Sequence, residues 1–222
     1  MEKKNIQIDI RDYPPQLHEY LDGADIFDSS CGENSRVLYS SKGYYIKIAP
    51  KGSLDREATI TDYFYDNGIG AELVKYFSAD QDYMVTRPAP GRDATHFLEK
   101  PEMLCKALAQ AMKYLHSLPM DNIIPSPSME YYKTDGIVTA DTFIHGDFCL
   151  PNIMLEDYSF KAFIDVGLAG AGDRHIDIFW CIWSLWFNLK TDRYTDYFLD
   201  LYGRENIDMS KLKYIAIKED KV

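Results

Sequence analysis

The chain lacks the features that would assign it to several common classes of protein. No run reaches the roughly 18 apolar residues of a membrane span, and the amino-terminal MEKKNIQIDIRDYPPQL has no signal-peptide core. The four cysteines, Cys31, Cys105, Cys149 and Cys181, are scattered without a CxxC pair, which argues against both a zinc site and a disulfide framework. These absences predict a cytoplasmic protein with reduced thiols.

An excess of positive charge is also missing. The sequence has 24 Lys+Arg against 35 Asp+Glu, a formal net charge of -11. Nucleic acids and anionic membranes are bound through basic patches, so neither is an expected partner. A cationic small molecule suits this balance better. With 222 residues and 46% hydrophobic content, the chain can form one domain or two small lobes with a real core. We expect a monomer by default.

The first part of the chain has the pattern of a small sheet. Residues 26–48 alternate β-favouring and polar positions around an SSKG turn, which predicts two or three strands. Residues 54–67 have helical spacing of apolar residues, and residues 72–88 read as two more strands. The proline- and glycine-rich RPAPGRD that follows predicts a hinge.

The second part is mostly helical. Residues 103–118 form an amphipathic pattern that predicts a helix, residues 120–140 read as loop with at most short helices, and three further helices are expected after residue 176. We therefore predict an α+β protein with a β-rich lobe, 1–88, and a larger, mostly helical lobe, 89–222, with a cleft between them.

Two apolar runs in the second part carry unexpected polar residues. FIHGDFCLPN (143–152) contains a histidine, an aspartate and an asparagine, and FIDVGLAG (163–170) contains another aspartate. Burying such groups costs a few kcal/mol each unless they are hydrogen-bonded. They therefore indicate either a structural network or a reacting centre.

Phosphoryl transfer from a nucleotide needs metal ions, a cation on the phosphates and a carboxylate that orients the attacking hydroxyl. Asp147 is our candidate base, and Asn152 and Asp165 offer the oxygen ligands that Mg²⁺ prefers. Lys47 is the candidate phosphate-binding cation, and Glu57 lies ten residues on, where it could fix the lysine by an ion pair. A hairpin-like return would bring Asp147, Asn152 and Asp165 together.

Each of these residues also has an ordinary structural interpretation. Asp and Asn are common in turns, Lys47 could protect a strand edge, and Glu57 could be a solvated helix residue. We expect His145 to hold the catalytic loop by hydrogen bonds and Asp177 to anchor the loop backbone. The tryptophans at 180, 183 and 186 recur every three residues, which favours core or subdomain packing over a sugar-stacking platform.

The segments HGDFCLPN, FIDVG and AGDRHIDI resemble the catalytic loop, metal-binding segment and following helix start of the aminoglycoside 3'-phosphotransferases, members of the protein-kinase-like superfamily. YLHSLP and KLKYIAIKED extend the similarity over nearly the whole chain. The resemblance implies a bilobal kinase fold, ATP or GTP as donor, and Mg²⁺.

It also implies site residues beyond the motif. Backbone at 31–36 would cover the phosphates, and the segment from Met84 to Ala89 would line the adenine pocket. Glu219 and Asp220 would hold the amines of an antibiotic.

Two departures leave the acceptor open. The family usually has an arginine where this chain has Leu168, and only 28 residues separate His116 from His145, fewer than in antibiotic-modifying members. The acceptor could instead be a choline-like compound, an amino sugar or another metabolic alcohol. A third interpretation is a catalytically weak nucleotide-binding protein that has kept the fold.

Overall fold

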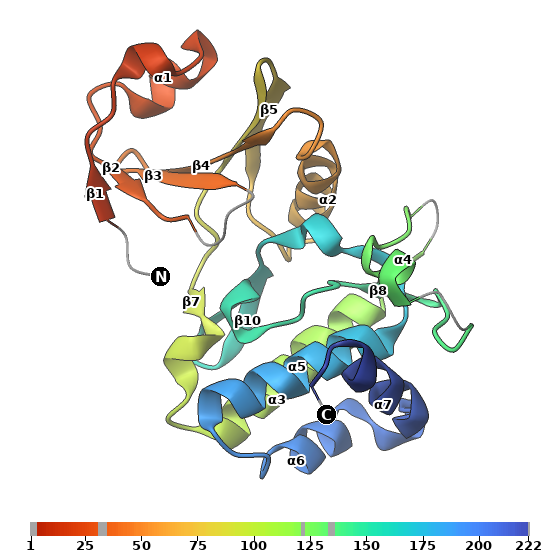
Figure 1. Ribbon diagram of the computed structural model, residues 1–222. Coiled ribbons are helices and arrows are strands. Elements are labelled where there is room, and N and C mark those ends of the chain that lie inside the picture. The colour runs from red at the N-terminus through yellow and green to blue at the C-terminus, as the bar shows by residue number, and fades with distance from the viewer. Residues whose placement is uncertain (1–3, 31–34, 121–122, 133–135, 222) are drawn as a thin grey trace. The chain divides into compact units, whose positions relative to one another are not determined.

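Two compact units make up the chain, Met1–Ala89 and Pro90–Val222. The computed structural model describes residues 4–30, 35–120, 123–132 and 136–221 (Figure 1). The division lies within the proline-rich stretch that follows the last strand of the first unit.

A six-stranded antiparallel sheet forms the first unit, in the order β1-β2-β3-β4-β6-β5. The strands are β1 (Lys4–Ile6), β2 (Ile26–Asp28), β3 (Arg36–Ser40), β4 (Tyr44–Pro50), β5 (Leu73–Ser78) and β6 (Gln81–Thr86). The strands predicted within 26–48 and 72–88 are confirmed. The SSKG turn joins β3 to β4, with Gly43 at φ +81°, a conformation that glycine adopts without strain.

The alternating residues of β4 give the sheet two different faces. Ile46 and Ile48 are buried in a cluster that includes Leu17 of helix α1 (Pro15–Leu21). Ala49 packs on the opposite face with Ala58 of helix α2 (Asp55–Asp66). Successive side chains of a strand point to opposite faces, so Lys47 lies on the α2 side.

One buried carboxylate fixes the start of α2. Asp82 of β6 is fully buried and accepts hydrogen bonds from the Leu54 backbone N–H (2.9 Å) and the Ser78 hydroxyl (2.7 Å). Burial raises the pKa of Asp82, but these hydrogen bonds outweigh it and hold that pKa at about 2. An ionised Asp82 therefore caps the helix that carries Glu57.

Helices dominate the second unit (Figure 1). They are α3 (Pro101–His116), α4 (Ser128–Tyr132), α5 (Arg174–Leu189), α6 (Thr195–Tyr202) and α7 (Met209–Lys218). α3 begins two residues before the predicted start, with Pro101 in its first turn, where proline is favoured. The three helices predicted after residue 176 are observed as α5, α6 and α7, and α5 begins three residues before its predicted start. No bilayer-spanning helix occurs within the described ranges.

Short strands flank the two apolar segments that carry polar residues, 143–152 and 163–170. They are β7 (Arg92–Asp93), β8 (Thr142–Ile144), β9 (Ile153–Glu156), β10 (Ser159–Phe163) and β11 (Gly170–Gly172). β9 and β10 form an antiparallel hairpin in which Ile153 pairs with Phe163, and β8 pairs with β11. Each of the two runs thus both begins and ends at a paired strand.

Candidate active site

A buried carboxylate holds the backbone of the loop that follows β8. Asp177 of α5 is completely buried and accepts hydrogen bonds from the backbone N–H groups of His145 and Gly146, both at 2.8 Å. The Nε2 of His116 lies 3.1 Å from the same carboxylate. A carboxylate with this many donors is firmly held, so the loop backbone is anchored to α5 and α3 together.

His145 is locked in one tautomer by its two neighbours. Its Nε2 lies 3.1 Å from the carbonyl oxygen of Ile164, to which it donates, and its Nδ1 accepts a hydrogen bond of 3.3 Å from the Asp147 N–H. The ring is fully buried and meets Phe148 edge-on. Both ring nitrogens are used for positioning, which leaves His145 as a support for the loop.

Gly146 allows the loop to pass close to the segment after β10. Its φ is +82°, and a Cβ there would lie 2.5 Å from the carbonyl oxygen of Leu168. Any side chain would therefore clash with backbone. Leu168 itself is 42% exposed, and its carbonyl accepts a hydrogen bond of 2.7 Å from Ser126.

Asp147 and Asn152 face each other across the loop. The Asn152 Nδ2 donates to the Asp147 carboxylate at 2.9 Å and to the Asp147 carbonyl at 3.0 Å. Asn152 is 8% exposed, whereas Asp147 is half-buried. With Nδ2 committed to Asp147, the amide oxygen is the atom that Asn152 can offer to a cation.

Asp165 joins this group through the hairpin. The N–H of Ile164 donates to the carbonyl of Asn152 at 3.0 Å, and Asp165 follows directly, with an exposed side chain and a left-handed backbone at φ +57°. Non-glycine residues in that conformation are uncommon and cluster at functional sites. Within the described residues no group of three His, Cys, Asp or Glu side chains could hold a metal. An amide and a carboxylate suit Mg²⁺, which usually takes the rest of its oxygens from phosphates and water.

In the first unit, Lys47 and Glu57 form an ion pair. The Lys47 Nζ lies 2.7 and 2.8 Å from the two carboxylate oxygens of Glu57, and the two side chains are only 18% and 10% exposed. Met84 pairs with Lys47 across the sheet and is buried, and Ala89 is half-buried at the end of this unit. The roles of these four residues toward a nucleotide stay predictions. Of the expected phosphate-covering backbone, residues 31–34 lie outside the described part of the chain.

The proposed amine-binding acids differ from each other in their surroundings. Glu219 caps the end of α7, and its carboxylate accepts a hydrogen bond from the Tyr132 hydroxyl of α4. Burial, followed by the nearby Glu219, raises the pKa of Tyr132. Asp220 is exposed, with φ +52°. Glu219 therefore ties α7 to α4.

Several residues that matter to the site were not singled out by the sequence. Asp173 accepts hydrogen bonds from the Thr139 N–H (2.8 Å) and the Lys211 ammonium (2.7 Å), and it also pairs with His175. This network fixes α7 against the start of α5. An aspartate before a helical pattern is a capping signal, but Lys211 is 38 residues away and no local spacing predicts their contact. Of the three tryptophans, Trp180 and Trp183 are half-buried, whereas Trp186 is 50% exposed and does not belong to the core.

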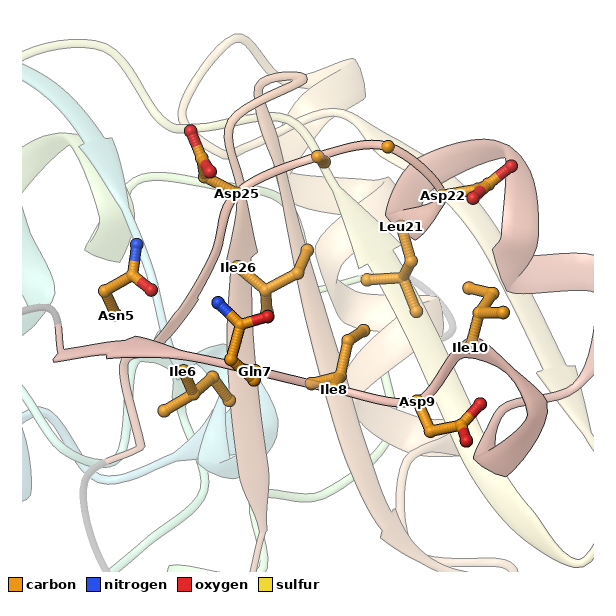
Figure 2. Close-up of a pocket in the computed structure, with 12 residues that line it drawn as sticks. Asn5, Ile6, Gln7, Ile8, Asp9, Ile10, Leu21, Asp22, Asp25 and Ile26 are labelled. Atoms are coloured by element: carbon orange, nitrogen blue, oxygen red, sulfur yellow. The ribbon is translucent and has the colours of Figure 1, made fainter.

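A separate pocket of about 440 Å³ lies at the β1 edge of the first unit (Figure 2). Its wall consists of residues 5–10 and 21–26. The carboxylates of Asp9, Asp22 and Asp25 lie apart and do not converge on one point (Figure 2), in agreement with the lack of a three-residue metal-ligand group among the described residues. None of the predicted catalytic, metal-binding, nucleotide-binding or amine-binding side chains lines this pocket.

The chain is similar to known phosphotransferases in sequence and in fold. The family model described as "Phosphotransferase enzyme family" matches residues 137–215. A probable aminoglycoside 3'-phosphotransferase of Lactococcus lactis is 35% identical over 255 aligned positions, which cover 97% of each chain. A crystal structure of an aminoglycoside-3'-phosphotransferase of type VIII superposes with a TM-score of 0.71 at 19% identity, covering 93% of this chain and 97% of that one. An aminoglycoside phosphotransferase of Streptomyces rimosus in complex with ADP and streptomycin superposes with a TM-score of 0.69 at 18% identity, covering 83% and 89%.

Fold and loop together define a kinase-like phosphotransferase, an enzyme that phosphorylates a small molecule. The expected α+β kinase-like fold is confirmed. More narrowly, the chain belongs to the aminoglycoside 3'-phosphotransferase family of the protein-kinase-like superfamily.

Proposed function

We propose that the protein transfers the γ-phosphoryl group of ATP or GTP, with Mg²⁺, to a hydroxyl of an aminoglycoside antibiotic and so confers resistance. The observation that carries the proposal is the Asp147–Asn152 pair, with Nδ2 2.9 Å from the carboxylate, on a loop whose backbone is anchored by Asp177. Free thiols at Cys105, Cys149 and Cys181 and the need for a nucleotide favour a cytoplasmic location.

Asp147 is proposed to orient the acceptor hydroxyl and accept its proton. Its carboxylate is half-buried, and one of its oxygens is held by Asn152, so it is preorganised and still reachable. Such a base contributes through positioning more than through covalent chemistry in phosphoryl transfer. His145 takes no proton in this scheme, because both of its ring nitrogens are used in the loop.

Asn152 and Asp165 are proposed to hold Mg²⁺ through their side-chain oxygens. A bound Mg²⁺ would offset the negative charge of the nucleotide phosphates. In the other unit, Lys47 is proposed to bind the phosphates, with Glu57 restricting the ammonium to one position. Met84 and Ala89 are proposed to contact the adenine. These assignments rest on the family membership and on the contacts of each residue within its own unit.

The acceptor class rests on charge. A net charge of -11 favours a polycation, and the exposed carboxylate of Asp220 is proposed to bind an acceptor amine. Glu219 is proposed to bind an acceptor amine as well, while its carboxylate accepts the hydrogen bond from the Tyr132 hydroxyl. The ADP and streptomycin bound in the S. rimosus structure are ligands of that protein.

A second acceptor class is favoured by the length of the chain. The alignment with the L. lactis relative spans 255 positions, whereas this chain has 222 residues, so at least 255 − 222 = 33 positions have no counterpart here. The interval between His116 and His145, 28 residues here, is proposed to leave a smaller acceptor site, which suits a smaller cationic alcohol such as choline or an amino sugar. A catalytically weak nucleotide-binding protein is less favoured, because Lys47, Asp147, Asn152 and Asp165 are all present.

Purified protein should be incubated with γ-labelled ATP or GTP and a panel of aminoglycosides, amino sugars and choline, with Mg²⁺ and with a chelator. We expect acceptor-dependent transfer that the chelator abolishes. If phosphoryl transfer occurs only to choline or to an amino sugar, that compound and not an aminoglycoside is the acceptor. Slow nucleotide hydrolysis that no acceptor stimulates would contradict the proposal.

A further inference from the structure

Two tryptophan rings on α5 already hold an ammonium group. The centroids of Trp180 and Trp183 are 5.6 Å apart, with their planes at 80°. The Lys221 Nζ lies 4.3 Å from the centroid of Trp180 and 4.1 Å from that of Trp183. Both distances are within the roughly 6 Å range of cation–π attraction, so one ammonium interacts with both rings.

This aromatic pair lies next to the loop that carries Asp147. The N–H of Leu150 donates to the Ser184 hydroxyl at 3.0 Å, and the Cys149 Sγ lies 4.0 Å from the carbonyl oxygen of Trp180. The loop therefore packs on the same turn of α5 that carries both tryptophans.

The Cys149 thiol is within electrostatic reach of both charged groups. Burial raises the pKa of Cys149 most, and Asp147 raises it further, whereas the Lys221 ammonium lowers it. Cys149 also links Asp147 to Trp180 by contact, because its N–H donates to the Asp147 carbonyl oxygen at 2.8 Å and its Sγ lies 4.0 Å from the Trp180 carbonyl oxygen.

The chemistry around Lys221 is that of a site for an organic cation. Trp180 and Trp183 are half-buried and offer ring faces. Glu219, two residues before Lys221, adds a carboxylate that Tyr132 holds. Aromatic faces beside a fixed carboxylate recognise protonated amines. The Lys221 side chain is a protonated amine on a flexible stem, so it occupies this site as a tethered mimic.

We propose that Trp180 and Trp183 form a subsite for an ammonium group of the acceptor, which Lys221 occupies until an aminated acceptor displaces it. The inference deepens the proposed function and rests on it, since it assumes an acceptor that carries an amine. The subsite selects acceptors with a protonated amine close to the hydroxyl to be phosphorylated. A neutral alcohol gains nothing from it.

The test uses the full chain and three variants: Lys221→Met, Lys221→Met with Trp183→Leu, and Trp186→Phe as the matched control. Trp186 lies on the same helix and is half exposed. KM and kcat are measured with an aminated acceptor and with its deaminated analogue. Lys221→Met should lower KM for the aminated acceptor at least twofold, with kcat and the analogue unchanged, because the competing ammonium is removed.

Adding Trp183→Leu to Lys221→Met should raise KM for the aminated acceptor about two- to thirty-fold, the range that cation–π contacts of about 0.5–2 kcal/mol correspond to. Trp186→Phe should leave every parameter unchanged. If the double variant with Trp183→Leu does not fold, the KM of Lys221→Met alone tests the subsite. KM that is unchanged or raised in Lys221→Met, with transfer intact, overturns the subsite and leaves the proposed function standing.

A separate readout covers the case in which no acceptor is phosphorylated. All three tryptophans of the chain lie on α5, so intrinsic fluorescence reports on this helix. The aminated compound should change the fluorescence of Lys221→Met saturably and at lower concentration than in the unmodified chain. That result would keep the subsite while the proposed function fails. No saturable change in either protein would overturn the subsite as well.

Discussion

Asp147 is the residue on which the proposed chemistry depends most. Asp147→Asn keeps the size of the side chain but removes the proton acceptor, so we expect transfer to fall by about 10²- to 10⁴-fold. Nucleotide binding, measured by calorimetry, should change less than twofold. Asp157→Asn is the control: Asp157 is exposed on the β9–β10 turn at φ +49°, a conformation that asparagine tolerates. Full activity in Asp147→Asn would remove the residue from the mechanism.

Gly146 tests the close approach of the loop to Leu168. In Gly146→Ala the new Cβ would lie 2.5 Å from the Leu168 carbonyl oxygen at φ +82°. Gly52 has the same φ of +82°, but a Cβ there would meet nothing within 4 Å. Both alanines have an unfavourable backbone, and only the first also clashes.

We expect Gly146→Ala to lose about 1–3 kcal/mol more in free energy of unfolding than Gly52→Ala, because both variants share the backbone strain and only Gly146→Ala adds the cost of overpacking against the Leu168 carbonyl oxygen. Urea unfolding measures the difference. Equal losses in the two variants would mean that the loop can move away from Leu168 freely.

At the scale of elements, α2 depends on a single buried carboxylate. Asp82→Asn weakens the hydrogen bonds to Leu54 and Ser78 and should cost about 1–3 kcal/mol at neutral pH. The folded pKa of Asp82, about 2, is below the unfolded value. The contribution of Asp82 to the free energy of unfolding is therefore fully present above its unfolded pKa of about 4 and is lost as pH falls toward 2.

The free energy of unfolding should consequently fall more steeply in the unmodified chain than in Asp82→Asn between about pH 4 and pH 2. Chemical denaturation at several pH values measures both slopes. Parallel curves would show that Asp82 is not the group that titrates. Ser53→Ala, at an exposed serine near the same helix start, serves as control.

The elements were predictable wherever one periodicity dominated. β4, α2 and α5 each have an apolar pattern of constant period, and all three lie where the sequence indicates them. α1 and β1 were not predicted, because only three residues of α1 are buried and β1 has just three residues. Such short elements depend on packing against the sheet, which no local pattern encodes.

The site was predictable to the extent that its residues are close in sequence. Asp147 and Asn152 are five residues apart, and the hairpin brings Asp165 to them. Contacts between residues far apart in the sequence were not predicted, such as those of Lys221 with Trp180 and of Lys211 with Asp173. Their existence depends on how α7 packs against α5.

At the scale of the whole molecule, each of the two units supplies part of the proposed reaction. The first contains the Lys47–Glu57 pair, and the second contains Asp147, Asn152 and Asp165. As proposed above, Lys47 acts on the nucleotide phosphates as a cation that needs no metal, whereas Asp165 acts through Mg²⁺. The two contributions therefore differ in their dependence on Mg²⁺.

The proposed division of nucleotide binding between Lys47 and Asp165 is tested most directly by calorimetry. ATP is titrated, with and without Mg²⁺, into the unmodified chain, Lys47→Met and Asp165→Asn. We predict weaker binding in both variants, with the Mg²⁺ dependence retained in Lys47→Met and lost in Asp165→Asn. If Asp165→Asn binds ATP as tightly as the unmodified chain, with the same dependence on Mg²⁺, the account of the site is contradicted.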